Sequence, residues 1–354
     1  MKIVFRVDSS IQIGSGHLMR CLTLADELAR VGNSIVFICK ELKGNLIQLI
    51  KFPVISLPIN KRFYSESLHL SWPYSIQVED AKQTIEAISD DIDLLIVDSY
   101  ALDKVWHQEL RPYTKKIMVI DDLANKSFDC DILLNQNAGS ERLGYRDLTP
   151  GGCYLLLGLQ YAMLRPEFLA HRKRALAKRK KTQDIKNILV SMGGSDKKNV
   201  SYDILERLSS RFNVVVVLGL ASVHKQMILN YAKSKNIKVI INADNMSELM
   251  LNADLSIGAG GSTSWERCCL GLPTLIYVLS ENQKEIAREL EQFGAAMLVR
   301  NFEHDLKALT SNLDIWKLMS DKSQSMCDGL GVKRISRVLM SGKKDKRNDF
   351  EEEV

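Results

Sequence analysis

The sequence predicts an α/β protein with two doubly wound, Rossmann-like domains. Short apolar runs recur along the chain, and they are continuous rather than alternating, which is typical of parallel strands covered on both faces. The 354 residues, 45% of them hydrophobic, exceed one ordinary core and suffice for two domains of about 150 residues each. The series of runs stops at a basic stretch and then starts again. We therefore expect two such domains in tandem, facing a central cleft.

The N-terminal domain is expected over residues 1–162. Its predicted strands are the apolar runs at 3–5, 35–38, 94–97, 117–120, 132–134 and 154–157. After the first run, apolar residues recur at helical spacing from Leu18 to Ala29, with charged residues between them. This spacing predicts an amphipathic helix directly after the first strand.

Residues 163–183 are expected to form a basic linker. Seven positive charges gather within it: Arg172, Lys173, Arg174, Lys178, Arg179, Lys180 and Lys181. Without these seven charges, the formal net charge of +5 becomes −2. The rest of the chain therefore offers no basic face for nucleic acid, and a solvated linker or helix accounts for the run.

The C-terminal domain is expected over residues 184–340, with strands at 188–190, 214–217, 239–241, 255–257 and 274–277. Residues 341–354 mix Lys, Asp, Arg and Glu around one aromatic residue, so we expect a charged, disordered tail. The sequence runs directly into a strand pattern, and no apolar run approaches the ~18 residues of a membrane span. We expect a cytoplasmic protein without a membrane span.

The seven cysteines are scattered, odd in number and without a C-x-x-C pair. This pattern indicates neither a disulfide framework nor a zinc site.

A histidine stands at the glycine turn between the first strand and the first helix. Gly14 and Gly16 permit a tight turn and let a substrate approach the backbone, while the helix N-terminus favours an anion. The same field disfavours an imidazolium, so we expect His17 to hold a neutral ring that accepts a proton near neutral pH. The alternative is a histidine that only caps the helix.

Two glycine turns in the C-terminal domain are similar to phosphate-binding loops. They follow the predicted strands at 188–190 and 255–257, and they contain Gly193, Gly194 and Ser195 in the first turn and Gly261, Ser262 and Thr263 in the second. Neither turn matches G-x-G-x-x-G or G-x-x-x-x-G-K-[ST], which disfavours a Rossmann dehydrogenase and a P-loop kinase. The hydroxyl and N–H groups of the second turn are suited to a diphosphate.

Two further polar residues fit a nucleotide sugar. Glu266 lies one turn into the helix that follows the second glycine turn, where a carboxylate accepts hydrogen bonds from a ribose diol. Asn282 lies just past the run at 274–277, where an amide contacts a sugar or phosphate or else caps the next helix.

The motifs together resemble a known enzyme family. Segment 5–17, F-R-V-D-S-S-I-Q-I-G-S-G-H, resembles the opening of the UDP-2,4-diacetamido-2,4,6-trideoxy-β-L-altropyranose hydrolases of pseudaminic acid biosynthesis. The resemblance continues at 94–100, 129–137, 161–168 and 192–199, within roughly the first 300 residues. The second half is similar, more loosely, to the transferases that add N-acetylglucosamine to a lipid-linked muramyl peptide. This resemblance implies a glycosyltransferase-B fold whose C-terminal domain holds UDP.

The resemblance also implies roles for individual residues. His17 matches the catalytic histidine of the family, and Tyr100 matches an active-site tyrosine that holds sugar or water. The sugar-side positions are Asn135, Asn137 and Arg165, and the nucleotide or substrate contacts are Glu266 and Asn282.

Two further assignments come from the residues themselves. Asp8 is our candidate for orienting His17. Asp121 and Asp122 follow a predicted strand and precede a predicted helix, so we interpret this pair as a cap rather than as a metal site.

The implied reaction is hydrolysis of the bond between the anomeric carbon and the diphosphate of the UDP-sugar. His17 activates water as a general base, UDP is the product that leaves, and inversion is expected. The helix N-terminus at 261–263 stabilises the leaving group, so neither a metal nor another cofactor is needed. The alternatives are a glycosyltransferase of the same fold with an alcohol acceptor and a non-catalytic nucleotide-sugar-binding protein.

Overall fold

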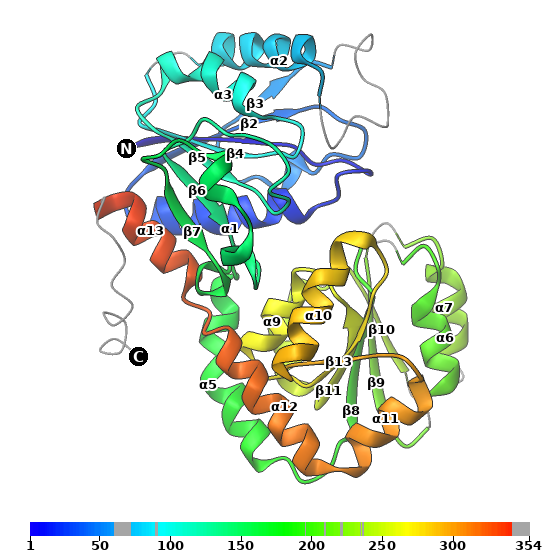
Figure 1. The fold of residues 1–354 in the computed structure, drawn as a ribbon. Coiled ribbons are helices and arrows are strands. Elements are labelled where there is room, and N and C mark those ends of the chain that lie inside the picture. Colours follow the sequence, from blue (N-terminus) through cyan, green and yellow to red (C-terminus); the bar gives the residue numbers. More distant parts are fainter. Residues whose placement is uncertain are drawn as a thin grey trace. The chain divides into compact units, whose positions relative to one another are not determined.

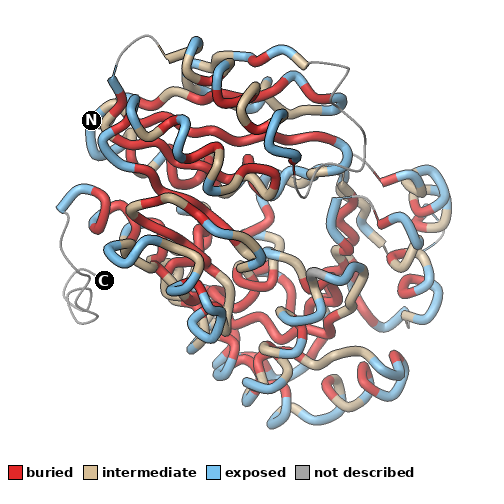
Figure 2. The backbone as a smooth tube through the Cα atoms, turned by 45° about the horizontal axis from the view of Figure 1, so that its top comes forward, coloured by how far each residue is buried: buried red, intermediate tan, exposed pale blue. Residues whose placement is uncertain are grey.

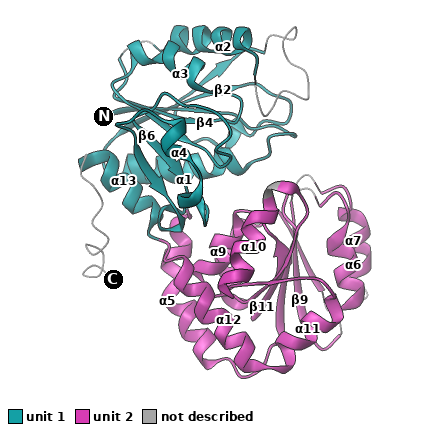
Figure 3. Cartoon of the chain, viewed as in Figure 1, with its two compact units in different colours: residues 1–163, 330–354 teal, residues 164–329 magenta. Residues whose placement is uncertain are grey.

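The chain forms two compact units, which are seen in a computed structural model (Figures 1 and 3). The structure describes residues 1–59, 72–88, 91–194, 196–208, 210–219, 222–233, 235 and 237–341. Unit 1 comprises residues 1–163 and 330–354, and unit 2 comprises residues 164–329.

Unit 1 is built on a parallel sheet of seven strands in the order β3-β2-β1-β4-β5-β6-β7. The strands are β1 (Lys2–Val7), β2 (Ser34–Lys40), β3 (Val54–Leu57), β4 (Leu94–Asp98), β5 (Ile117–Ile120), β6 (Ile132–Asn135) and β7 (Tyr154–Leu157). The chain starts at β1, runs outward to β3 and returns to β4 on the other side of β1. The order of the strands therefore reverses between β1 and β4, where open parallel sheets bind their ligands.

Helices cover both faces of this sheet (Figures 1 and 2). They are α1 (Gly16–Arg30), α2 (Tyr74–Ala87), α3 (Lys104–Leu110), α4 (Tyr145–Leu148) and α13 (Gly331–Ser341), with short 3₁₀ turns at Ile47–Leu49, Arg111–Tyr113, Ser140–Arg142 and Leu159–Tyr161. Ile3 and Phe5 pack in one core with α1 and α13, whereas Val4 packs in the other core with α2 and α3. Alternate strand residues thus enter different cores, which explains why the apolar runs are continuous.

Unit 2 has a parallel sheet of six strands in the order β10-β9-β8-β11-β12-β13. The strands are β8 (Asn187–Ser191), β9 (Asn213–Leu218), β10 (Ile237–Ile241), β11 (Leu255–Ala259), β12 (Thr274–Tyr277) and β13 (Met297–Leu298). The helices are α5 (Pro166–Lys181), α6 (Val200–Arg207), α7 (Lys225–Ala232), α8 (Met246–Asn252), α9 (Thr263–Cys269), α10 (Lys284–Phe293), α11 (Phe302–Ser311) and α12 (Leu313–Met326), with a 3₁₀ turn at Glu281–Gln283. Helices α6, α7, α11 and α12 contribute to one core with the strands.

The basic stretch expected as a linker at 163–183 forms helix α5 over most of its length, and this helix is part of unit 2 rather than a separate linker. Its cations hold other helices: Arg172 donates to the carbonyls of Cys269 and Cys327, and Arg179 donates to the carbonyl of Ala253. These carbonyls lie at the C-terminal ends of helices, where backbone acceptors lack partners within the helix. The clustered positive charge therefore serves the packing of unit 2, which a count of charges along the sequence does not reveal.

The C-terminal domain was expected to extend to residue 340, which would include helix α13. This helix belongs instead to unit 1. Its residues Ile335, Val338 and Leu339 are buried in the core that contains α1. Periodicity predicts an apolar helix face but does not say which core it enters. The tail expected from residue 341 lies outside the described residues from 342 onward. Within the part of the chain that the structure describes, no helix combines the length and apolarity needed to cross a bilayer.

Candidate functional site

The predicted base lies where the strand order of unit 1 reverses. A loop after β1 closes through a bridge between Ser10 and Gly14, and Gly14 has a φ of +82°, which glycine adopts without strain. Helix α1 then begins at Gly16, so that His17 lies in its first turn. The imidazole is largely buried, with 9% of the residue exposed.

His17 is oriented by the last residue of β4. Its Nδ1 atom lies 2.5 Å from Oδ1 of Asp98, and Asp98 pairs with Val7 in the register of β1 and β4. Burial alone would raise the pKa of Asp98, but Arg20 and His17 hold it well below its usual range. The ionised carboxylate accepts a hydrogen bond from Nδ1–H, which leaves the lone pair of the neutral ring on Nε2. Among the described residues, none forms a hydrogen bond with Nε2.

Arg20 joins Asp98 to a second carboxylate. It lies one turn after His17 on α1, and its Nε and Nη2 atoms donate to Asp98 at 2.6 and 2.7 Å. Its Nη1 atom donates to Oδ2 of Asp122 at 2.7 Å. With a neutral imidazole, these two carboxylates and one guanidinium carry a net charge of −1. A positive charge that develops on His17 during a reaction would therefore face a net negative charge in this cluster.

Asp122 also holds two of the residues predicted for the site. Tyr100 donates from its hydroxyl to Oδ2 of Asp122 at 2.7 Å, and Asn137 donates from Nδ2 to Oδ1 at 2.9 Å. Burial and the Asp122 charge raise the pKa of Tyr100 far above its usual range, so the phenol stays protonated. Its ring meets that of His17 edge to face, with centroids 4.5 Å apart. The structure therefore brings His17, Tyr100 and Asn137 together.

Asn135 does not line the site with His17, Tyr100 and Asn137 but lies buried behind it. The residue is fully buried, donates from Nδ2 to the hydroxyl of Tyr145 at 2.9 Å and accepts from the backbone N–H of Asn137 at 3.0 Å. Tyr145 in turn donates to Asp121 at 2.8 Å. Because its side chain is enclosed by these partners, Asn135 is suited to fixing Asn137.

The cap expected at Asp121 and Asp122 is only partly correct. Asp121 accepts from the backbone N–H groups of Leu123 and Ala124, so it caps a turn that no helix follows. Asp122 instead points its carboxylate at Arg20. From the sequence alone, each of the two aspartates could either cap a turn or form an ion pair. Only the position of α1, which carries Arg20, shows that Asp122 is the one that forms the ion pair.

Asp8 does not orient His17 and was wrongly assigned this role. It accepts from Arg6 at 2.7 Å and from the backbone N–H of Lys40 at 2.7 Å, and it is buried. Arg6, two residues earlier, lies on the same side of the strand and forms an ion pair with Asp8. The signal that identifies the orienting residue is the aspartate that ends the neighbouring strand β4, because the carboxyl ends of parallel strands meet at one edge.

The two glycine turns of unit 2 lie at the same edge of its sheet. Ser191 pairs with Gly258 at the ends of β8 and β11, and the turns follow directly. Gly193 has a φ of +84°, which favours glycine, and a Cβ on Gly219 would lie 2.2 Å from the carbonyl oxygen of Gly194, so no side chain fits at position 219. In the second turn Ser262 is exposed, and Gly261 and Thr263 are partly exposed.

The side chains of two of the residues predicted for the site in unit 2 are not described. Ser195 lies outside the described residues, and the side chain of Asn282 is likewise not described.

Glu266 lies near Arg165, which the family resemblance assigns to the sugar side. Arg165 approaches Oε1 of Glu266 to 3.6 Å and also pairs with Glu167 at 3.1 Å. Burial raises the pKa of Glu266 to about 7, while the charge of Arg165 opposes this shift. A carboxyl group that titrates near neutrality is typical of a ligand-binding position.

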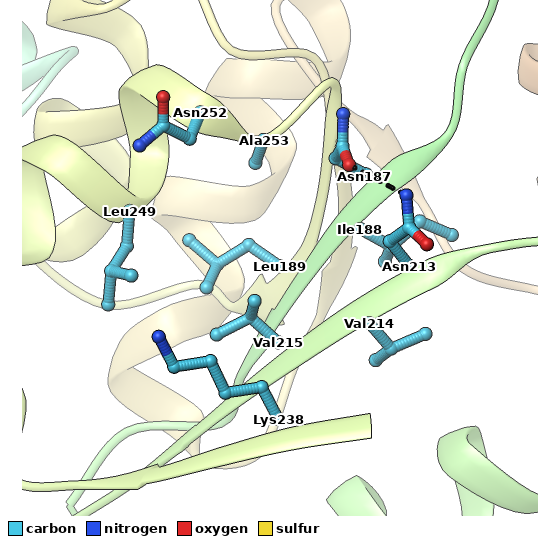
Figure 4. A pocket seen from close by; sticks show the side chains of 10 residues that line it. All are labelled: Asn187, Ile188, Leu189, Asn213, Val214, Val215, Lys238, Leu249, Asn252 and Ala253. Atoms are coloured by element: carbon cyan, nitrogen blue, oxygen red, sulfur yellow. Dashed lines mark hydrogen bonds between the residues drawn. The ribbon is translucent and has the colours of Figure 1, made fainter. Parts of the chain in front are cut away.

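A cavity of about 380 Å³ lies at the opposite edge of the same sheet (Figure 4). Asn187 and Asn213, which begin β8 and β9, line it together with Leu189, Lys238 and Asn252. It contains none of the residues predicted for the site.

The fold is that of the glycosyltransferase-B class. Residues 173–338 match the model of the glycosyltransferase family 28 C-terminal domain. The crystal structure of MurG from Acinetobacter baumannii superposes with a TM-score of 0.63 at 13% identity, over 96% of this chain and 100% of that one. This likeness confirms the predicted fold class.

The chain belongs to the UDP-2,4-diacetamido-2,4,6-trideoxy-β-L-altropyranose hydrolase family, as the resemblance of its motifs predicts. It is 30% identical to the hydrolase of that name from Campylobacter jejuni over 299 residues, which are 83% of this chain and 97% of that protein. It is also 33% identical to an uncharacterized protein of Methanocaldococcus jannaschii over 80% of this chain. The match spans 57% of the length of that archaeal protein.

Proposed function

We propose that this protein hydrolyses UDP-2,4-diacetamido-2,4,6-trideoxy-β-L-altropyranose to UDP and the free sugar. The observation that carries the proposal is the pairing of His17 with Asp98, which directs the lone pair of a neutral imidazole away from its carboxylate partner. The family supports the substrate, because the Campylobacter jejuni relative has this hydrolase name. Unit 1 supplies the base, and unit 2 supplies the nucleotide site.

In the proposed reaction, the oxygen of water forms a bond to the anomeric carbon while the bond from that carbon to the diphosphate oxygen breaks. The water proton passes to Nε2 of His17, and the bonding electron pair leaves with UDP. Attack opposite the leaving group inverts the anomeric configuration. The Asp98–Arg20–Asp122 cluster stabilises the imidazolium as it forms, since the proton cancels the net negative charge.

UDP requires stabilisation of its charge more than a proton, and no metal is needed in this proposal. Gly193 and Gly194 bring backbone N–H groups near the diphosphate, and Ser262 and Thr263 add hydroxyl groups. Glu266 accepts from the ribose. On the sugar side, the Tyr100 hydroxyl and the Asn137 amide hold the substrate or the attacking water, and Asp122 fixes both side chains.

The test is incubation of the protein with the UDP-sugar and no acceptor. A hydrolase releases UDP and free sugar in equal amounts, and NMR of the fresh product shows whether the anomer is inverted. Binding without release would indicate a non-catalytic binding protein, and release only after addition of an alcohol acceptor would indicate a transferase.

The His17→Asn variant tests the base directly. We expect turnover to fall by at least about 10²-fold, as for loss of a general base, while UDP still binds. Near-normal turnover of this variant would remove His17 from the mechanism even if the enzyme is a hydrolase.

A further inference from the structure

A buried arginine lies directly behind the glycine turns of unit 2. Arg267 is on α9 and is 3% exposed. Its Nη2 atom donates to the carbonyl of Ala259 at 2.7 Å and to Oγ of Ser264 at 2.8 Å. Both partners are neutral; Ala259 ends β11, directly before the second glycine turn, and Ser264 lies in α9, which follows that turn.

The guanidinium lies at the edge of the sheet where both turns begin. A Cβ on Gly258 would lie 2.1 Å from Nη1 of Arg267 and 2.9 Å from the carbonyl oxygen of Ser191. Gly258 and Ser191 are paired at the ends of β11 and β8. A glycine at 258 therefore makes room for the cation at the start of both turns.

The charge of Arg267 has no direct ion-pair partner among the described residues, and the adjacent carboxyl group of Glu266 acts on it only at longer range. Across the described part of unit 2, no carboxylate lies within ion-pair distance of it, and its Nε atom is buried without a hydrogen-bond partner. Burial lowers the pKa of Arg267 to about 10, so the group remains charged at neutral pH. A buried cation that is not paired is unfavourable, and fixed protein charges of this kind commonly act on a bound ion of opposite sign.

We propose that Arg267 is a positioning residue whose buried charge draws the diphosphate of UDP onto the glycine turns of unit 2. The proposal rests on the proposed function, since it assumes that UDP binds at these turns. Arg267 acts across the backbone rather than by contact. At an effective dielectric constant of about 20, a unit charge about 12 Å from a phosphate charge changes affinity about tenfold, which corresponds to about 1.4 kcal/mol.

The alternative is that Arg267 only pins the turn, which means that its hydrogen bonds fix the backbone conformation of the turn and its charge plays no part. Two substitutions separate charge from pinning. Arg267→Lys keeps the charge and loses the planar fork, whereas Arg267→Gln keeps a donor for the Ala259 carbonyl and loses the charge. Arg267→Met serves as the neutral variant if Arg267→Gln does not fold.

Arg179 provides a matched control within the same unit. It is also 3% exposed, donates to the backbone carbonyls of Ala253 and Met250, and has a buried Nε atom without a partner. It lies at the opposite edge of the sheet, because Ala253 precedes β11. Arg179→Gln therefore removes a similar buried charge far from the glycine turns.

The experiment is calorimetric titration of each full-length variant with UDP and with uridine, which lacks the phosphates. We expect Arg267→Gln to weaken UDP binding about tenfold and uridine binding less than about twofold, with Arg267→Lys close to the parent protein for both. Arg179→Gln should leave both affinities unchanged.

Equal losses for UDP and uridine, or a larger loss for Arg267→Lys than for Arg267→Gln, would overturn the charge proposal in favour of pinning. Unchanged UDP affinity in Arg267→Gln would overturn it outright. Failure of the parent protein to bind UDP would instead refute the proposed function.

Discussion

Asp98→Asn tests whether the carboxylate behind His17 stabilises a proton taken from water. The substitution keeps the shape of the side chain and removes its charge. Asp98 accepts from His17 on Oδ1 and from Arg20 on both oxygens. Whichever way an amide is turned, its NH₂ group therefore faces a donor.

The expected loss follows from the geometry. A hydrogen bond to a charged group contributes about 1.5–3 kcal/mol. Full charges about 4 Å apart at an effective dielectric constant of about 20 interact by about 4 kcal/mol. Arg20 already compensates part of the Asp98 charge, so the net loss of stabilisation lies below about 4 kcal/mol. At 1.36 kcal/mol for each tenfold change, we expect kcat to fall by about 10²-fold.

The assay is release of UDP from the UDP-sugar, with kcat and the affinity for UDP measured separately. UDP affinity should not change, because the proposed nucleotide site is in unit 2. Asp8→Asn is the matched control: it removes another buried carboxylate of unit 1, one that pairs with Arg6. A kcat within about threefold of the parent in folded Asp98→Asn would refute the role assigned to this carboxylate, as would an equal loss in folded Asp8→Asn.

Three further predictions concern unit 2. Burial raises the pKa of Glu266 to about 7, so its carboxylate forms as the pH rises through about 7, and we expect uridine to bind up to about tenfold more tightly at pH 8 than at pH 6. Calorimetry should show no such dependence in Glu266→Gln. Gly258→Ala places a methyl group against the buried guanidinium and should lower the free energy of unfolding by about 1–3 kcal/mol in urea titrations, whereas Gly261→Ala, with nothing within 4 Å, should not. Arg172→Met removes three hydrogen bonds to backbone carbonyls and should cost about 2–4 kcal/mol by the same assay, against less than about 0.5 kcal/mol for the exposed Lys173→Met.

Much of the architecture can be predicted from the sequence, because a strand covered on both faces needs an unbroken apolar run. The run at 94–97, for example, became β4 in the middle of the sheet of unit 1. Charge was a poorer guide. The basic run that suggested a linker is a helix whose cations meet helix ends, and these partners come from distant parts of the chain.

The candidate site was predictable where a residue type implies its own chemistry. His17 and Tyr100, named from motifs, lie together in the structure. The partners of His17 were not predictable in the same way, since Asp8 and Asp98 both stand at the carboxyl end of a strand, Asp8 just after β1 and Asp98 as the last residue of β4. Which of them reaches the imidazole depends on Arg6, which binds the nearer carboxylate, and on the pairing of β1 with β4.

Helix α13 affects how this chain can acquire its structure during synthesis. Ile335, Val338 and Leu339 complete a core whose other members begin at Ile3, so the core of unit 1 cannot close until residue 339 has left the ribosome. Unit 2, a continuous segment, can fold earlier. A gene fragment that stops at residue 163 would therefore expose an apolar surface on α1 and encourage aggregation, whereas a fragment encoding 164–329 carries its own core.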